Sequence, residues 1–336
     1  MNPPTSIPDP GGADVGVAAL RRALAAVAIL WGVWILVFHF VGNSTLGYVE
    51  TNSMFGWWFW VNTRGLEAGN LLGVFDQDEA HAWFMPVVAA ALIWRERSAV
   101  RRLDLRPAWW ALGIFLAALL LHFCGYVVQQ TRLSVAAFAV GLYALSGFVL
   151  GGGWMRLTLF PFGLLLLCVP LGNSAEFITF PLRVFVSKIS VGVANGLFGL
   201  DVVREGTQLY NSARTFQFDV APACSGIRSL VALGAIMTVY GYLALESNWR
   251  RILMVLAAVP LAVFGNALRI ITTIVVAETS GQEAGARIEQ NLGFLTFAVA
   301  LVGALALGKL LQEKSPAAKP AEAKTSPAQA NEEVIE

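Results

Sequence analysis

Long apolar runs constrain this chain more than any other feature. Eight stretches approach the length of about 20 residues that an α-helix needs to cross a bilayer. The whole chain is 57% hydrophobic and only 13% charged, whereas a soluble domain carries roughly 25% charged residues. The sequence therefore predicts an all-α integral membrane protein with about eight transmembrane helices. The predicted spans are 23–42, 80–94, 108–127, 133–150, 157–173, 228–245, 252–277 and 292–311.

Composition also bounds the domain organisation. Residues 1–20 and 313–336 are rich in Pro, Ala, Lys and Glu and too poor in large apolar residues to pack, so we expect them to be disordered. One polytopic membrane domain, carrying the candidate catalytic residues, is predicted over 21–312. The net charge of +1 excludes a nucleic-acid-binding surface, and three cysteines are too few for a disulfide framework.

Basic residues predict the orientation in the membrane. Fourteen of the 23 Lys and Arg residues fall on one side if the eight spans alternate, and the opposite loop 43–79 is acidic. Because Lys and Arg accumulate in cytoplasmic loops, both termini are predicted to lie in the cytoplasm, with the protein in the inner (cytoplasmic) membrane. A ninth crossing over 174–199 would break this charge bias. Arg183 and Lys188 interrupt that segment, so it is interpreted as an amphipathic helix in the outer interface.

A small extracytoplasmic loop precedes the sixth span. Residues 202–210 and 215–220 partly alternate between apolar and polar, as the two strands of a β-hairpin do. Pro222 ends the second strand, and Cys224 follows at the turn into a helix.

Cys224 is the first candidate for chemistry. The N-terminus of a helix offers unpaired N–H groups and the positive end of the helix dipole, both of which favour a thiolate and lower the pKa of a cysteine. Arg228, one helical turn further on, adds positive charge. The alternative interpretation is a small buried apolar residue, which suits Cys124 and Cys168 inside helices better than Cys224.

The seventh span contains a second candidate pair, Asn266 and Arg269. An arginine at the bilayer centre costs about 2.5–3.5 kcal/mol on insertion scales and usually faces a polar interior. The two residues are three apart and so share a helix face. Arg269 either extends to the outer interface or is a buried cation that pairs with a thiolate or binds a substrate oxygen.

The three histidines, His39, His81 and His122, are all predicted near the outer leaflet. Their spacing matches no metal-ligand motif, and no metal or cofactor is expected. His81 is the better candidate for a supporting role because it lies beside Asp78 and Glu79.

At two of these sites the sequence resembles the exosortase/archaeosortase family of membrane transpeptidases. The matching motifs are Ala-Cys-Ser-Gly-Ile-Arg-Ser-Leu at 223–230 and Asn-Ala-Leu-Arg-Ile at 266–270. Weaker similarity extends over about 76–311. It includes Asp76 to Arg97 with His81, Arg-Leu-Thr-Leu-Phe-Pro at 156–161 and Val-Pro at 169–170.

The resemblance implies an activity. Members of this family act as thiol proteases and transpeptidases in protein sorting, on exported proteins with a short C-terminal signal, a membrane helix and a basic tail (PEP-CTERM and related tails). The cysteine cleaves near the signal through an acyl-thioester and passes the new C-terminus to an acceptor. On this chain the resemblance makes Cys224 the nucleophile and Arg269 the proton donor or charge stabiliser, at a site facing the periplasm or cell exterior.

The chain departs from the family in the third catalytic residue. The family generally has a histidine, or in archaeal members an arginine, in a pattern like His-x-x-x-Gly before the last helix. Here the corresponding stretch is 287–293, with Glu289 in the apparent place of the histidine. Arg287 is the hypothesised substitute, and Glu289 is the alternative.

Two other function classes remain open from the sequence. A transporter or scaffold for extracellular polymer assembly would use Arg269 as a ligand site and have no need of Cys224. A metal-dependent membrane hydrolase would use the histidines instead.

Overall fold

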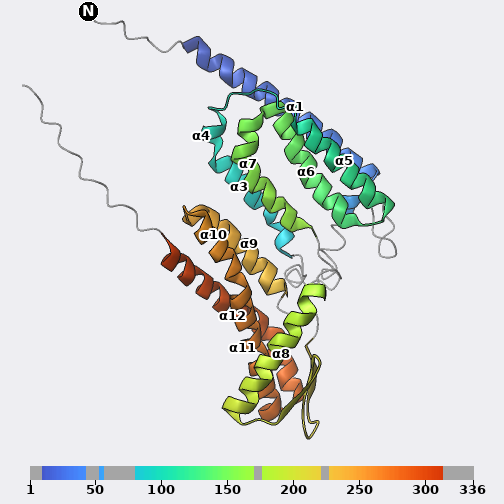
Figure 1. Cartoon of the computed structure of the whole chain (residues 1–336), viewed down its shortest axis with the longest axis vertical. Helices are drawn as coiled ribbons and strands as arrows, with labels where there is room; N and C mark the ends of the chain where they lie inside the picture. Colours follow the sequence, from blue (N-terminus) through green and yellow to red (C-terminus); the bar gives the residue numbers. More distant parts are fainter. Residues whose placement is uncertain (1–9, 43–52, 57–79, 170–175, 221–226, 313–336) are drawn as a thin grey trace, which may run out of the picture.

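Helices make up most of the chain in the computed structural model, and they form two groups that follow each other along its longest axis (Figure 1). The structure describes residues 10–42, 53–56, 80–169, 176–220 and 227–312. The first group comprises α1 and α3 to α7. The second group comprises α8 to α12 together with a small antiparallel sheet.

The first group is centred on α6, which is buried along most of its length. Indole groups of α1 bind its main chain: Trp31 Nε1 donates to the Leu142 carbonyl (3.0 Å), and Trp34 Nε1 donates to the Phe138 carbonyl (3.2 Å). Gly141 permits this approach, because a Cβ there would lie 2.5 Å from the Trp34 indole. The helices are α1 (Pro10–Phe40), α3 (Met85–Arg95), α4 (Arg97–Val100), α5 (Ala111–Val127), α6 (Thr131–Leu150) and α7 (Gly152–Leu164).

The second group is built on the antiparallel pair α11 (Ala258–Ser280) and α12 (Gln282–Leu311). Gly281, with φ +87°, makes the tight turn between them. Glycine adopts a positive φ of this kind without steric cost. The remaining helices of this group are α8 (Glu176–Phe198), α9 (Ile227–Ala244) and α10 (Asn248–Leu256).

Two arginines of α10 bind the C-terminal ends of neighbouring helices. Arg250 Nη1 donates to the Leu311 carbonyl of α12 (2.8 Å), and Arg251 Nε donates to the Leu245 carbonyl just after α9 (2.9 Å). Cations stabilise the negative end of a helix dipole. The ends of α9 and α12 are therefore tied together at the end that the basic residues predict to be cytoplasmic.

The two groups of helices contact each other through side chains of α7, α9 and two 3₁₀ turns. Phe160 of α7 stacks on Tyr242 of α9, with ring centroids 3.8 Å apart. A small core also joins the 3₁₀ turns η3 (Ala80–Trp83) and η4 (Leu165–Cys168) to α9.

Within the described ranges, three helical segments are long and apolar enough to cross a membrane: Ala18–Phe40, Thr131–Leu150 and Asn248–Ser280. Four shorter apolar helices match further predicted spans: Ala111–Val127, Gly152–Cys168, Ser229–Ala244 and Leu295–Leu311. The second predicted span differs most, because α3 has 11 residues and a length of only about 16 Å. The total of eight spans stays a prediction.

The sheet differs from the predicted two-stranded hairpin. It has three strands in the order β1-β2-β3: β1 (Val202–Glu205), β2 (Gln208–Asn211) and β3 (Gln217–Asp219). The stretch 202–210, predicted as one strand, folds back on itself at Gly206, whose φ of +63° allows a two-residue turn. The inner face of the sheet packs on α8 and α11.

The segment predicted as an amphipathic outer helix is α8. Its buried face combines the apolar Val186 and Ala194 with the polar Arg183, Ser187 and Ser190. Ser190 Oγ lies 3.5 Å from the Ala267 carbonyl of α11. Large apolar side chains such as Phe180 and Phe185 are exposed on α8. Buried polar side chains together with exposed apolar ones suit a helix in contact with lipid, and the charged Lys188 is exposed on the same helix.

Candidate active site

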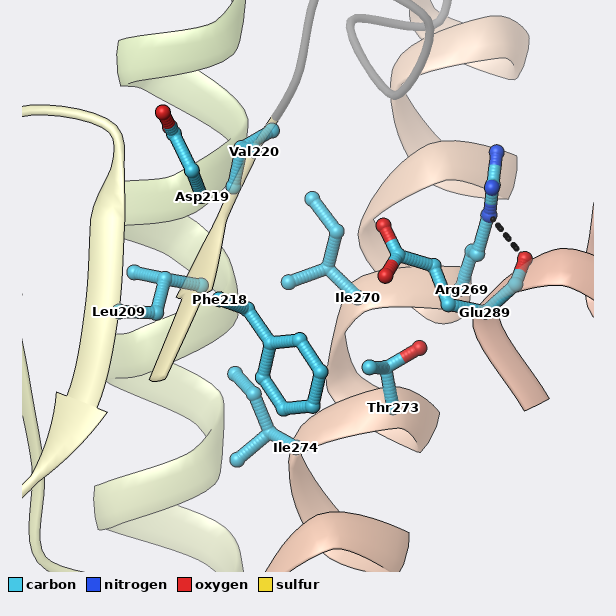
Figure 2. A pocket seen from close by; sticks show the side chains of 9 residues that line it. All are labelled: Leu209, Phe218, Asp219, Val220, Arg269, Ile270, Thr273, Ile274 and Glu289. Carbon is cyan, nitrogen blue, oxygen red and sulfur yellow. Dashed lines mark hydrogen bonds between the residues drawn. The ribbon is translucent and has the colours of Figure 1, made fainter. Parts of the chain in front are cut away.

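A small pocket forms where the sheet meets α11 and α12 (Figure 2). Its volume is about 20 Å³, which exceeds the roughly 10–15 Å³ needed to hold one water molecule. Apolar side chains form most of its wall, and four polar residues join them. The lining consists of Leu209, Phe218, Asp219, Val220, Arg269, Ile270, Thr273, Ile274 and Glu289.

Arg269 is half-buried in this pocket, on α11. Its Nε donates to the main-chain carbonyl of Glu289 on α12, at 3.0 Å (Figure 2). Since the bond uses Nε, it fixes the plane of the guanidinium and leaves the two terminal nitrogens directed away from Glu289. The α11–α12 pairing therefore orients the cation.

Glu289 contributes its side chain as well as its carbonyl. Its carboxylate extends from α12 towards Ile270 and β3 (Figure 2). Asn266, predicted as a supporting residue, is buried on α11 one turn before Arg269. The predicted Asn266–Arg269 helix thus carries both residues into the interior of the second helical group.

Arg287 lies elsewhere. It is exposed on α12, where it forms an ion pair with Glu283 at 3.7 Å, and it does not line the pocket. Residues two apart on an α-helix are about 200° apart around its axis. Because Glu289 faces the pocket, Arg287 faces outward.

Two predicted residues cannot be placed in full. Cys224 lies outside the described residues, in the stretch between Val220 and α9. Arg228 belongs to the first turn of α9, and its side chain is outside the description.

The predicted supporting residue His81 has a structural partner. It lies in η3, where its Nε2 is 2.8 Å from the Leu167 carbonyl of η4, and it does not line the pocket. His39 contacts Ser53, and His122 is buried on α5 against Ser134. Among the residues that the structure describes, no three His, Cys, Asp or Glu side chains are grouped as metal ligands.

Sequence reasoning missed two polar residues of the pocket. Thr273 is buried (4% exposed), and its Oγ1 has no hydrogen-bond partner within the described part of the chain. Asp219 accepts a hydrogen bond from Thr207 Oγ1 at 2.8 Å. A signal for Thr273 was available, since it lies four residues after Arg269 and therefore on the same helix face. Nothing in the sequence singles out Asp219.

The arrangement combines three chemical groups around one small space. A guanidinium can stabilise a developing oxyanion, and a carboxylate can accept or return a proton. A buried hydroxyl without a partner can bind a polar group of a ligand. The pocket can therefore support charge stabilisation and proton transfer at one small space.

Comparison with known proteins identifies the family. The sequence model of the transmembrane exosortases matches residues 70–306, well over half of the chain. This range contains the pocket, both helical groups apart from α1, and the Cys224 motif. No curated protein and no solved structure matches the chain. The family match agrees with the motifs at 223–230 and 266–270, and the chain belongs to the transmembrane exosortase family.

Proposed function

We propose that this protein is a membrane-embedded cysteine transpeptidase or protease that removes C-terminal sorting signals from exported proteins. The observation that carries the proposal is the shared pocket of Val220, Arg269 and Glu289. Val220 is the last described residue before the Cys-Ser-Gly motif, and Arg269 belongs to the second family motif.

Chain connectivity supports a role for Cys224 at this pocket. A fully extended chain spans at most about 3.3–3.6 Å per residue, so four residues reach at most about 14 Å from Val220. Ile227, the first residue of α9, follows three residues after Cys224. Cys224 is therefore joined by a short stretch of chain to Val220 at the pocket on one side and to the N-terminus of α9 on the other.

In the proposed reaction the Cys224 thiolate attacks the carbonyl carbon of the scissile peptide bond. Arg269 stabilises the oxyanion of the tetrahedral intermediate, and the leaving amine is protonated as the acyl-thioester forms. An amine or hydroxyl acceptor, or water, then attacks the thioester and restores the thiolate. Arg228 adds positive charge near the thiolate, and Asn266 supports Arg269 from the same helix. His81, bound to the Leu167 carbonyl away from the pocket, has no part in this step.

For the third catalytic residue we favour Glu289 over Arg287. Glu289 lines the pocket and holds Arg269 through its carbonyl, whereas Arg287 is exposed and paired with Glu283. The carboxylate would accept the thiol proton of Cys224 and deliver it to the leaving amine. Arg287 remains the alternative. It lies two residues before Glu289 and carries the positive charge of the arginine found in archaeal members.

We further propose an inner-membrane location, with both termini cytoplasmic and the pocket on the outer side. Arg250 and Arg251 support this orientation, because they lie with the C-terminal ends of α9 and α12 at the opposite end of α11 from the Gly281 turn. Substrates would be exported proteins with a C-terminal signal and a membrane helix.

The test compares membranes from cells that express the wild-type protein or Cys224→Ala. Intact-mass and C-terminal peptide analysis would identify exported proteins that lose an apolar tail. We expect tails to persist only in the mutant, and a residual mass on the mature C-terminus would identify the acceptor. If no protein differs, the peptidase proposal fails, and a transporter or scaffold for polymer assembly becomes the function to test.

A further inference from the structure

The edge strand β3 immediately precedes the Cys224 motif along the chain. The strand order β1-β2-β3 makes β3 an edge strand, and Val220, which follows it, lines the pocket. Cys224 is five residues after Asp219, the last residue of β3.

The register shows which groups point outward. Val220 N donates to the Thr207 carbonyl at 3.0 Å, so Thr207 and Val220 form a hydrogen-bonded pair. Hydrogen-bonded and non-hydrogen-bonded pairs alternate along an antiparallel ladder. The pairs Gln208–Asp219 and Tyr210–Gln217 are therefore non-hydrogen-bonded. It follows that the N–H and C=O groups of Gln217 and Asp219 face away from β2.

The two edges of the sheet differ. At the β1 edge, the Asn195 side chain of α8 binds both outward groups of Val202: its Nδ2 donates to the Val202 carbonyl (2.9 Å), and its Oδ1 accepts from the Val202 N–H (3.0 Å). At the β3 edge, no described residue binds the outward backbone groups of Gln217 or Asp219. Both residues are exposed. The β1 edge is thus capped at Val202, whereas among the described residues neither outward position of β3 has a main-chain partner.

We propose that the open β3 edge binds the substrate as an added strand. The proposal rests on the proposed function and adds the conformation in which the substrate binds. An extended segment of the exported protein, adjacent to the cleavage site, pairs with Gln217 and Asp219. An extended peptide presents an outward N–H and C=O at every second residue, which matches the spacing of these two positions. Pairing along β3 directs the peptide past Val220 towards Cys224.

The pocket provides an independent observation for a ligand at this place. Thr273 lines the same pocket as Phe218 and Val220, and its buried Oγ1 has no hydrogen-bond partner among the residues that the structure describes, although buried hydroxyl groups in native structures normally have one. A peptide on the β3 edge would bring polar groups to this wall. In strand addition, main-chain hydrogen bonds supply affinity and adjacent pockets supply specificity.

Proline substitution on the two edges tests the proposal. Asp219→Pro removes an outward N–H from the open edge and leaves the bonds to β2 intact, which is the position where an edge strand tolerates proline. Arg204→Pro does the same on the opposite edge. Arg204 is two residues after Val202, so its N–H also points away from β2. Asp219→Ala measures the effect of losing the side chain alone.

The substrate is the exported protein whose tail loss depends on Cys224, with cleavage followed by pulse-chase in cells. Asp219→Pro is expected to process it at least about tenfold more slowly than Asp219→Ala, with Arg204→Pro within about twofold of wild type. Equal rates for the two proline variants would overturn strand addition and leave the proposed function standing. If no exported protein loses its tail in a Cys224-dependent manner, both the strand addition and the proposed function are overturned.

Cross-linking keeps the proposal testable if Asp219→Pro does not fold. Gln217→Cys is introduced into a chain whose native cysteines are replaced by alanine, and single cysteines are placed at successive positions before the substrate's tail. Directly opposed residues on paired strands have Cβ atoms about 4.5–5.5 Å apart, and their neighbours point to the other face. Disulfides at alternate substrate positions are expected. Equal cross-linking at consecutive positions, or none, would overturn the proposal.

Discussion

Replacing Arg269 by lysine tests how the pocket uses its cation. Lysine keeps the positive charge but has no equivalent of Nε, so the 3.0 Å bond to the Glu289 carbonyl is lost. A hydrogen bond that involves a charged group contributes about 1.5–3 kcal/mol. Since about 1.36 kcal/mol corresponds to a tenfold change in rate, Arg269→Lys should process substrate roughly 10- to 150-fold more slowly.

The assay is the initial rate of tail removal in a pulse-chase experiment, corrected for the amount of enzyme in the membrane. Arg204→Lys is the matched control: its Nη1 bonds the Gly206 carbonyl at an exposed turn, and its rate should stay within about twofold of wild type. A wild-type rate for Arg269→Lys together with an inactive Arg269→Ala would refute the reasoning. Charge alone would then suffice, and its orientation by α12 would be irrelevant.

Three further substitutions, two of them with a matched control, test the pocket and the packing of α11 on α12. Glu289→Gln should reduce tail removal by about 10²-fold or more, as loss of a general acid–base group does, whereas Arg287→Ala should change it little; the reverse pattern would assign the third role to Arg287. Thr273→Val should be at least as stable as wild type in thermal unfolding, because no described residue binds its buried hydroxyl, yet process substrate roughly three- to tenfold more slowly. Thr158→Val, which removes a 2.8 Å bond to a carbonyl of α7, should instead lose about 1 kcal/mol of stability, and equal stability losses would contradict the assignment. Gly285→Ala should destabilise the protein by about 1–3 kcal/mol, since its Cβ would lie 2.8–2.9 Å from side-chain atoms of α11 and β3; an unchanged melting temperature would contradict the α11–α12 packing.

The helices were the most predictable part of the fold. The predicted span 133–150 corresponds to α6 (Thr131–Leu150), and the other long apolar runs also became helices. These elements follow from composition over a local window, which the sequence contains directly. Arg269 was predictable for a similar reason, because an arginine within an apolar helix requires a polar surrounding.

The limits of prediction lie where local signals compete. The alternation over 202–210 and 215–220 predicts two strands, but a turn at Gly206, with its positive φ, divides the first stretch into β1 and β2. The second span was overestimated because α3 begins only at Met85, after the 3₁₀ turn that contains His81. The average over a sequence window indicates apolar content well, but it does not locate a single turn residue or a short 3₁₀ segment that ends a strand or a helix.

The contribution of Glu289 could not be deduced from the sequence alone. The family pattern directed attention to 287–293, and both Arg287 and Glu289 were plausible within it. The choice depends on how α12 rotates against α11 after the turn at Gly281, which is a property of tertiary packing. The same packing buries Thr273 beside the sheet.

The central claim is that Cys224 forms an acyl-thioester with the substrate, and trapping that intermediate tests it most directly. Purified enzyme in lipid nanodiscs would be mixed with the tailed substrate, quenched in acid and analysed by intact mass with and without neutral hydroxylamine. We predict an adduct of enzyme and truncated substrate on the Cys224 peptide that hydroxylamine releases, and no adduct in Cys224→Ala. Continued tail removal by Cys224→Ala, or an adduct on another residue, would contradict the account.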